Sequence, residues 1–195
     1  MAVESTSGYA GAAGAESGAL SALVVPEPLP TGRLTRAALA VVRIVVAMMW
    51  IQNVNWKIPS DFGRSRNSDL YHFVSGAVEH PVLAPYTWVV QHVVLPNFTL
   101  FGYITLLTEF ALGAFLLAGL FTRLFAAVGI LQSGAIALSV LNTPGEWHWS
   151  YYLMISAHLL LLAFAAGRVA GVDGLLRPRW RRSNGLPARL ALAAS

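Results

Sequence analysis

The sequence has 195 residues, of which 56 % are apolar and 11 % are charged, and its mean hydropathy is +0.60. A charged share of about 25 % is usual in soluble domains, so this composition excludes an ordinary water-soluble protein. The formal net charge is +4. The sequence contains no cysteine, and this absence excludes disulfides, thiolate metal sites and iron–sulfur ligation by this chain.

The first 31 residues are rich in Ala, Gly and Ser and contain no Lys or Arg. This composition predicts a disordered cytoplasmic N-terminal tail over residues 1–31. A cleaved signal peptide needs a basic segment directly ahead of a short apolar core, and that segment is missing here.

Four apolar segments approach the ~20 residues that a helix needs to cross a bilayer. They cover residues 34–52, 98–121, 124–141 and 149–166. The sequence therefore predicts an all-α integral membrane protein, a bundle of four transmembrane helices within residues 32–176. Most arginines lie before the first segment, between the second and third, and after the fourth. By the positive-inside rule both termini are cytoplasmic, and residues 177–195 form a basic cytoplasmic tail.

The predicted outer segment between the first two spans is too long for a simple turn. Residues 68–79 carry apolar side chains at helical spacing, which predicts an amphipathic helix on the membrane interface. Residues 86–95 are apolar, too short to span and bracketed by prolines, so an interfacial or re-entrant segment is expected. Together these segments would form an amphipathic, re-entrant lid over the outer end of the bundle.

Two ionisable side chains interrupt the predicted spans, Arg43 in the first and Glu109 in the second. A charge at the centre of a membrane helix is disfavoured by about 2.5–3.5 kcal/mol on insertion scales. Counted from the outer ends of their helices, the two residues lie at similar depth, so we expect them to contact one another or to share a polar partner. Two roles stay open for Glu109, fixing the packing of the bundle or relaying protons beside a quinone.

The fourth predicted span carries His158, with Met154 and Tyr151 on the same side of the helix. Such a histidine is either a hydrogen-bonded residue of the bundle or a partner for a quinone carbonyl. Haem ligation is not expected, because no second histidine falls at the same depth.

Polar and aromatic residues gather at the predicted outer end, among them Trp56, Lys57, Trp149 and Tyr151. They fit an aromatic belt at the interface, and their flat apolar walls also suit a quinone headgroup. No metal site is expected, since the outer histidines form no compact pair. The basic cluster at residues 177–182 predicts a topology signal that attracts anionic lipid headgroups, and no nucleic-acid partner is expected.

Several short motifs now resemble a known family. Residues 109–113 read Glu-Phe-Ala-Leu-Gly, residues 119–123 read Gly-Leu-Phe-Thr-Arg, residues 55–57 read Asn-Trp-Lys, and Gly167-Arg168 precedes Gly171-Val-Asp173. This pattern, over roughly residues 36–176, resembles the DoxX/DoxD superfamily of four-helix membrane proteins. Glu146-Trp147 and the long outer segment make the chain more similar to the DoxD branch, the small membrane subunit of thiosulfate:quinone oxidoreductase.

The resemblance implies a multi-pass protein of the bacterial inner membrane that works with other membrane or soluble subunits. It would help to pass electrons from a sulfur oxyanion to quinone, its candidate cofactor, and it would need a partner for enzymatic activity. The alternative is a non-catalytic anchor or accessory subunit of a respiratory or oxidative-stress complex, and the sequence leaves both open. The candidate catalytic residues are Glu109, His158 and Arg43, and the candidate cofactor contacts are Trp56, Lys57, Tyr151 and Trp149. We expect one pocket beneath the lid, between the first, second and fourth helices, with Glu109 at its floor and His158 on its wall.

Overall fold

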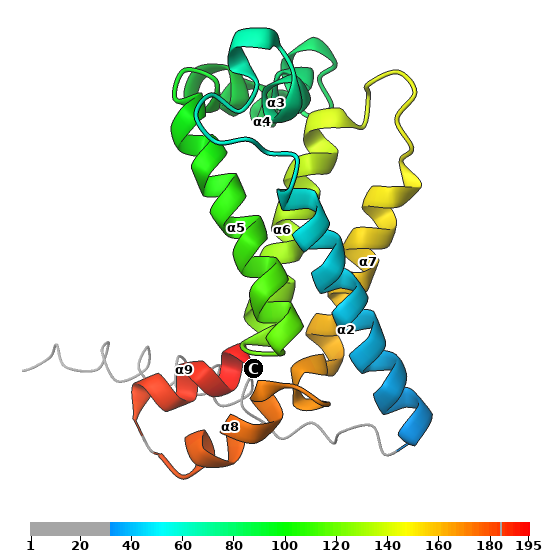
Figure 1. Ribbon diagram of the computed structural model, residues 1–195, viewed down its shortest axis with the longest axis vertical. Coiled ribbons are helices and arrows are strands. Elements are labelled where there is room, and N and C mark those ends of the chain that lie inside the picture. The colour runs from blue at the N-terminus through cyan, green and yellow to red at the C-terminus, as the bar shows by residue number, and fades with distance from the viewer. Residues whose placement is uncertain (1–31, 184) are drawn as a thin grey trace, which may run out of the picture.

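A computed structural model describes residues 32–183 and 185–195 of the chain. Throughout these two ranges the regular structure is helical, and they contain no strand (Figure 1). The predicted N-terminal tail, residues 1–31, lies outside the described residues. The chain is thus all-α over the part that the structure describes, as the sequence predicts.

Four long helices run side by side along the length of the molecule (Figure 1). They are α2 (Arg33–Val54), α5 (Phe98–Ala118), α6 (Thr122–Val140) and α7 (Trp149–Phe164). The first three are long and apolar enough to cross a membrane. With 16 residues, α7 is shorter than the usual spanning length, and a 3₁₀ turn, η3 (Ala166–Arg168), follows it.

The long helices pack through small residues, as expected for helices that associate in lipid. A Cβ atom at Gly113 on α5 would lie 2.7 Å from Ile51 Cγ1 on α2, and one at Gly129 on α6 would lie 2.2 Å from His158 Nε2 on α7. The shared core comprises Val46, Ala47, Trp50, Leu112, Leu116, Ala126, Leu161 and Ala166. Large apolar side chains such as Leu107 and Leu131 point outward, with exposed fractions of 64 % and 74 %. An outer surface of this kind suits lipid rather than water.

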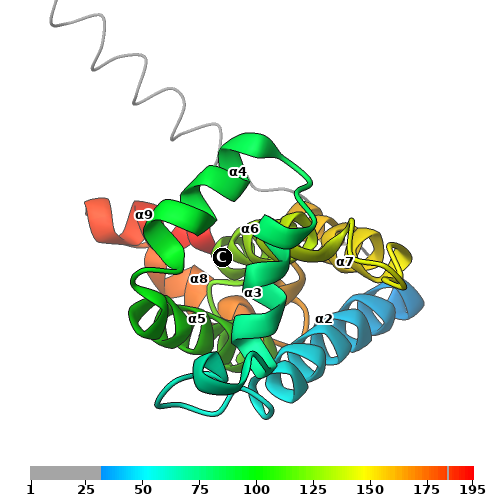
Figure 2. The same ribbon diagram turned by 90° about the horizontal axis from the view of Figure 1, so that it is seen from above.

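Short helices cover one end of the bundle, which we call the α3 end. They are η1 (Arg64–Arg66), α3 (Asp69–Glu79), α4 (Ala84–Val89) and the π-helix η2 (Val90–Val94). The structure is therefore helical in both segments in which the sequence predicts a lid, and α3 crosses the bundle end when viewed from above (Figure 2). Tyr86 joins α4 to α6, because its hydroxyl donates to Ala135 O at 3.0 Å. The Tyr86 side chain is half-buried between these helices, and this burial raises the pKa of its phenol.

Two further helices lie across the opposite end, which we call the α8 end (Figure 1). They are α8 (Val172–Arg181) and α9 (Leu186–Ala194). The segment predicted to be a basic tail is thus helical, and the predicted domain boundary at residue 176 falls inside α8. Arg177 links the two helices, donating to Leu192 O at 2.7 Å and to Ser195 O at 2.8 Å.

Candidate functional site

A buried ion pair lies where α2 ends beside α5. After Val54 the chain turns back, and Lys57 Nζ donates to Asn53 O at 2.8 Å and to Glu109 Oε2 at 2.5 Å. Lys57 is 4 % exposed and Glu109 is 1 % exposed. Gln132 on α6 donates to the other carboxylate oxygen of Glu109 at 3.3 Å. The cluster therefore connects three of the long helices through a buried ion pair and the half-buried amide of Gln132.

The ammonium group of Lys57 has a third neighbour, the ring of Trp56. Nζ lies 4.1 Å from the ring centroid, a cation–π distance. Trp56 is itself fixed, since its Nε1 donates to Asn53 Oδ1 at 3.0 Å and its ring meets Phe73 of α3 edge to face. With a carboxylate, a carbonyl and an aromatic face around it, Lys57 has a partner in each of its donor directions.

The prediction that Arg43 and Glu109 contact one another or share a polar partner is wrong. Arg43 Nη1 donates to Leu116 O at 2.6 Å and to Leu117 O at 2.7 Å, and Nη2 donates to Ala170 O at 3.0 Å. These acceptors are at the α8 end, and Leu117 lies eight residues beyond Glu109 on α5, about 12 Å of helix. Arg43 thus supplies positive charge to the carbonyl end of α5, where the helix dipole favours a cation.

The error comes from the starting level of α5. Its first residue, Phe98, is 1 % exposed because it packs with Phe62 and Leu70 in the cluster at the α3 end, beyond the end of α2. Counting both helices from their outer ends therefore places Glu109 too deep relative to Arg43. The residue at the level of Glu109 is Lys57, which the sequence places in a loop.

A second buried polar contact joins α2 to α7. Trp50 Nε1 donates to His158 Nε2 at 2.9 Å, and His158 Nδ1 lies 2.7 Å from Met154 O. Because a carbonyl only accepts, Nδ1 carries the proton and Nε2 is the acceptor. Trp50 and His158 are each 1 % exposed. His158 is therefore a neutral imidazole with both ring nitrogens bonded.

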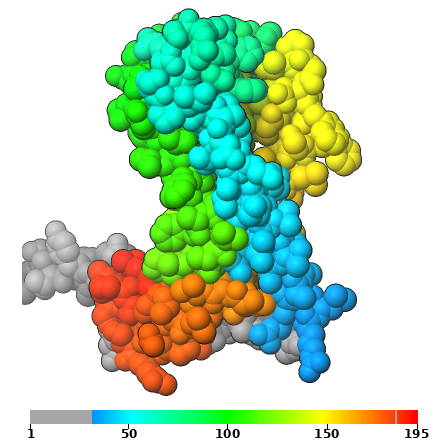
Figure 3. All heavy atoms as spheres, in the orientation of Figure 1, coloured from blue at the N-terminus to red at the C-terminus, as the bar shows by residue number. Residues whose placement is uncertain are grey.

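An apolar groove lies directly over this contact, with a volume of about 370 Å³. Its lining comprises Val41, Val42, Val45, Val46, Met49, Trp50, Leu153, Met154, Ala157 and His158. In the space-filling view the start of α7 (yellow) stands apart from α2, and the surface is hollowed between them (Figure 3). Trp50 and His158 supply the polar atoms nearest to this groove.

The prediction of one pocket that contains both His158 and Glu109 is wrong for this groove. His158 belongs to its lining, but Glu109 and Arg43 are not among the described residues that form it. The four predicted cofactor contacts lie outside it too. Trp56 and Lys57 belong to the Glu109 cluster, Tyr151 donates its hydroxyl proton to Glu146 Oε2 at 2.8 Å, and the Trp149 side chain is 67 % exposed. The structure thus separates the predicted site into an ion-pair cluster and an apolar groove.

The family is decided by a match that covers most of the chain. Residues 38–192 match the family described as TQO small subunit DoxD. The chain belongs to the DoxD family. This match extends through α8 and into α9, further than the motifs noted in the sequence. No curated protein and no solved structure matches this DoxD chain significantly.

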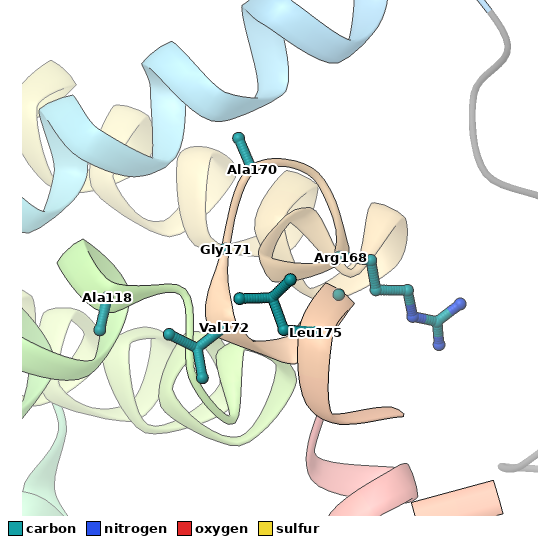
Figure 4. Close-up of a pocket in the computed structure, with 7 residues that line it drawn as sticks. Ala118, Arg168, Ala170, Gly171, Val172 and Leu175 are labelled. Atoms are coloured by element: carbon teal, nitrogen blue, oxygen red, sulfur yellow. The ribbon is translucent and has the colours of Figure 1, made fainter. Parts of the chain in front are cut away.

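A second hollow of the DoxD chain lies at the α8 end and has a volume of about 450 Å³. Its lining is formed by Ala118, Arg168, Ala170, Gly171, Val172, Gly174 and Leu175. Figure 4 shows the Arg168 side chain pointing away from Ala118 and Val172, so the hollow is walled mainly by backbone and apolar side chains. It offers no convergent polar groups like those at the floor of the α2–α7 groove.

Asp173 holds this end together. Its carboxylate accepts from Phe121 N at 2.8 Å and from Thr122 N at 2.9 Å, which are the first amides of α6. Burial raises the pKa of Asp173, and the two amide bonds oppose that shift. Burial also lowers the pKa of Arg177 to about 10, helped by the charges of Arg168 and Arg181. These two residues connect α6, α8 and α9.

Two residues of these buried polar contacts are not among the site residues predicted from the sequence, Trp50 and Gln132. Trp50 lies near the outer end of the first predicted span, where a tryptophan is expected in the interfacial aromatic belt, whereas the structure buries it against His158. Gln132 could have been found, because it is a lone polar amide in the middle of a predicted span, where a side chain of that kind needs a partner.

Proposed function

We propose that this DoxD chain is the membrane subunit of a quinone-linked redox complex and that the α2–α7 groove holds the quinone. The observation that carries the proposal is the Trp50–His158 contact at the base of an apolar groove. A volume of about 370 Å³ is within the range of small-molecule sites, and such sites combine apolar walls with a few polar groups. The groove opens to the outer surface of the bundle at Met49 and Leu153, which are 44 % and 62 % exposed. A lipophilic tail can leave the groove between these two apolar side chains.

Trp50 and His158 offer a hydrogen-bond donor and an acceptor, so together they suit both the quinone and its reduced form. A quinone carbonyl accepts hydrogen bonds, and the Trp50 N–H is a donor that it can share with His158 Nε2. Reduction by two electrons with uptake of two protons converts each carbonyl to a hydroxyl, which can donate to His158 Nε2. Binding of the reduced form at this base therefore requires His158 Nε2 to stay unprotonated.

The electrons must come from outside this chain. The family description supports thiosulfate as the donor and a larger partner subunit as its oxidation site, because TQO denotes thiosulfate:quinone oxidoreductase. In this assignment the DoxD chain binds and orients the quinone, and the partner supplies the redox group. Thiosulfate added to the DoxD chain alone should then leave the quinone oxidised.

We further propose that α7 crosses the membrane together with α2, α5 and α6, with both termini in the cytoplasm. At 1.5 Å per residue, its 16 residues measure about 24 Å, and a span this short is accommodated by local thinning of the bilayer. The arginines at the α8 end support a cytoplasmic location for that end, and the family supports the bacterial inner membrane.

Quinone binding is tested with the full chain in lipid nanodiscs. Decylubiquinone is titrated while tryptophan fluorescence is followed, and saturable quenching in the parent is the expected result. Replacing Trp50 by Phe should weaken binding at least tenfold, because the indole N–H that a quinone carbonyl would accept from is lost. The matched control is Trp149→Phe, which removes an exposed tryptophan outside the groove and should bind as the parent does. Absence of saturable binding in the parent would overturn the proposal and leave a non-catalytic anchor as the account of this chain.

A further inference from the structure

The α8 end concentrates positive charge on two helices that lie across the bundle. Residues 172–195 contain five arginines and a single acidic side chain, Asp173. Asp173 is buried and committed to the first amides of α6, and Arg177 is buried in the joint between α8 and α9. The other four arginines, at positions 179, 181, 182 and 189, are exposed. The exposed charge of these helices is therefore entirely positive.

The same helices expose leucines beside those arginines. Leu175 is 75 % exposed, Leu186 is 60 % exposed and Leu190 is 53 % exposed. On α8, Leu175 and Arg179 are four residues apart and so share a face; on α9, Leu186 and Leu190 do the same. Arg181 falls instead on the face of Asp173 and Arg177. The mixed surface thus consists of Leu175, Arg179, Arg182, Leu186, Arg189 and Leu190, which we call the α8–α9 surface.

The placement of these helices relates this surface to the membrane. Figure 1 shows α8 and α9 lying across the end of the bundle that contains the candidate spans α2, α5 and α6. In a bilayer that these long helices span, the two short helices lie at the level of the lipid headgroups. Leucines at that level enter the edge of the hydrocarbon, and guanidinium groups form paired hydrogen bonds with phosphate. The Arg177 bonds to Leu192 O and Ser195 O hold α8 and α9 together, so the exposed arginines of both helices lie at the same end of the bundle.

We propose that the α8–α9 surface is a binding site for the headgroups of anionic phospholipids. The charge of the surface is complementary to phosphatidylglycerol and not to a zwitterionic lipid. The leucines favour a bilayer over nucleic acid or an acidic soluble protein, because exposed leucines have no partner on a polyanion in water.

The test compares lipid retention by the full chain in detergent, measured by native mass spectrometry after addition of phosphatidylglycerol or phosphatidylcholine. We expect the parent to retain phosphatidylglycerol at least fivefold better. The variant R179Q/R182Q/R189Q should lose this preference. The control R64Q/R66Q removes two exposed arginines at the α3 end and should keep it.

Three results would overturn the proposal. The first is a parent without preference for the anionic lipid, and the second is a control that loses as much preference as the triple variant. The third is a parent that binds soluble poly-glutamate in preference to phosphatidylglycerol, which would assign the surface to an acidic protein. In 0.5 M salt, phosphatidylglycerol retention should fall for the parent and for the R64Q/R66Q control but not for the triple variant. That result would further support headgroup binding, because salt screens the attraction between arginine and phosphate.

Discussion

Lys57 and Glu109 form an ion pair, with Nζ 2.5 Å from Oε2, although 52 residues separate them in the sequence. The pair joins the turn that follows α2 to the middle of α5, and Gln132 extends it to α6. Each charge is buried, so each depends on the other for its stability in the bundle.

Removing one partner of this pair should destabilise the bundle strongly. Lys57→Met or Glu109→Leu alone leaves an uncompensated buried charge, and we expect the free energy of unfolding to fall by about 3–5 kcal/mol. The double variant should recover most of that loss, because no charge remains buried. Unfolding in SDS, followed by circular dichroism, measures all three. A double variant as unstable as the sum of the single ones would contradict the coupling.

Arg43 should stabilise the α8 end through its carbonyl contacts. Arg43→Met removes the donor for Leu116 O, Leu117 O and Ala170 O, and we expect a loss of about 2–3 kcal/mol. Arg43→Lys keeps the charge beside the end of α5 but has no planar fork, so its loss should be intermediate. Thermal unfolding in detergent ranks the variants. Equal losses for Met and Lys would show that the charge itself contributes nothing.

A methyl group on α6 should break the Trp50–His158 contact. In Gly129→Ala the new Cβ would lie 2.1 Å from His158 Cδ2, so the ring must move, at a cost of about 1–3 kcal/mol. Gly134→Ala is the control on the same helix, because nothing lies within 4 Å of its Cβ position. The control should unfold at the parent temperature or above, since alanine favours helix by up to about 1 kcal/mol. Equal unfolding temperatures for the two variants would contradict close packing of Gly129 against His158.

Asp173 should fix α8 against the start of α6. Asp173→Ala removes the acceptor of two backbone amides, and leaving such donors unsatisfied costs about 1–3 kcal/mol each when they are buried. Hydrogen exchange should then speed up at Phe121 and Thr122 before it does elsewhere in α6. Glu79→Gln, at an exposed carboxylate of α3, serves as the control and should leave both rates unchanged.

The proposed topology places both the α8 end and the residue 195 terminus in the cytoplasm. Green fluorescent protein fused after Ser195 should fluoresce, and alkaline phosphatase fused there should be inactive. The same reporters inserted between Pro144 and Gly145, in the turn between α6 and α7, should give the opposite result. An active phosphatase at the C-terminal fusion would reverse the orientation.

The helices of the bundle could be predicted from the sequence, whereas their relative levels could not. Apolar length marks a helix, and the three candidate spans follow from it. The level of α5 depends on Phe98, which packs into the cluster of Phe62 and Leu70. That contact is tertiary, so a count along the chain gives Glu109 the wrong cationic partner.

The separation of the candidate site has a similar cause. Lys57 follows the end of α2, and composition alone assigns such a lysine to solvent, since the backward turn that buries it is not visible in the pattern. His158 was found because a histidine in an apolar span needs a partner. Its hydrogen-bond donor, Trp50, lies on α2, and the two residues meet only because α2 packs against α7 at this level. At the α8 end, the arginines of residues 177–182 predict a solvated tail. The structure instead packs α9 against its neighbours through an apolar face that includes Ala188 and Leu192.

The Asp173 contact also constrains the order in which the protein can be completed. Thr122 begins α6, yet the carboxylate that satisfies its amide lies 51 residues later. A ribosome therefore finishes α6 and α7 before that carboxylate exists, and the positive end of α6 stays unmatched during insertion. This contact can form only after α7 has been made, so a chain that stops after α7 lacks Asp173 and would enter the membrane without reaching its final packing.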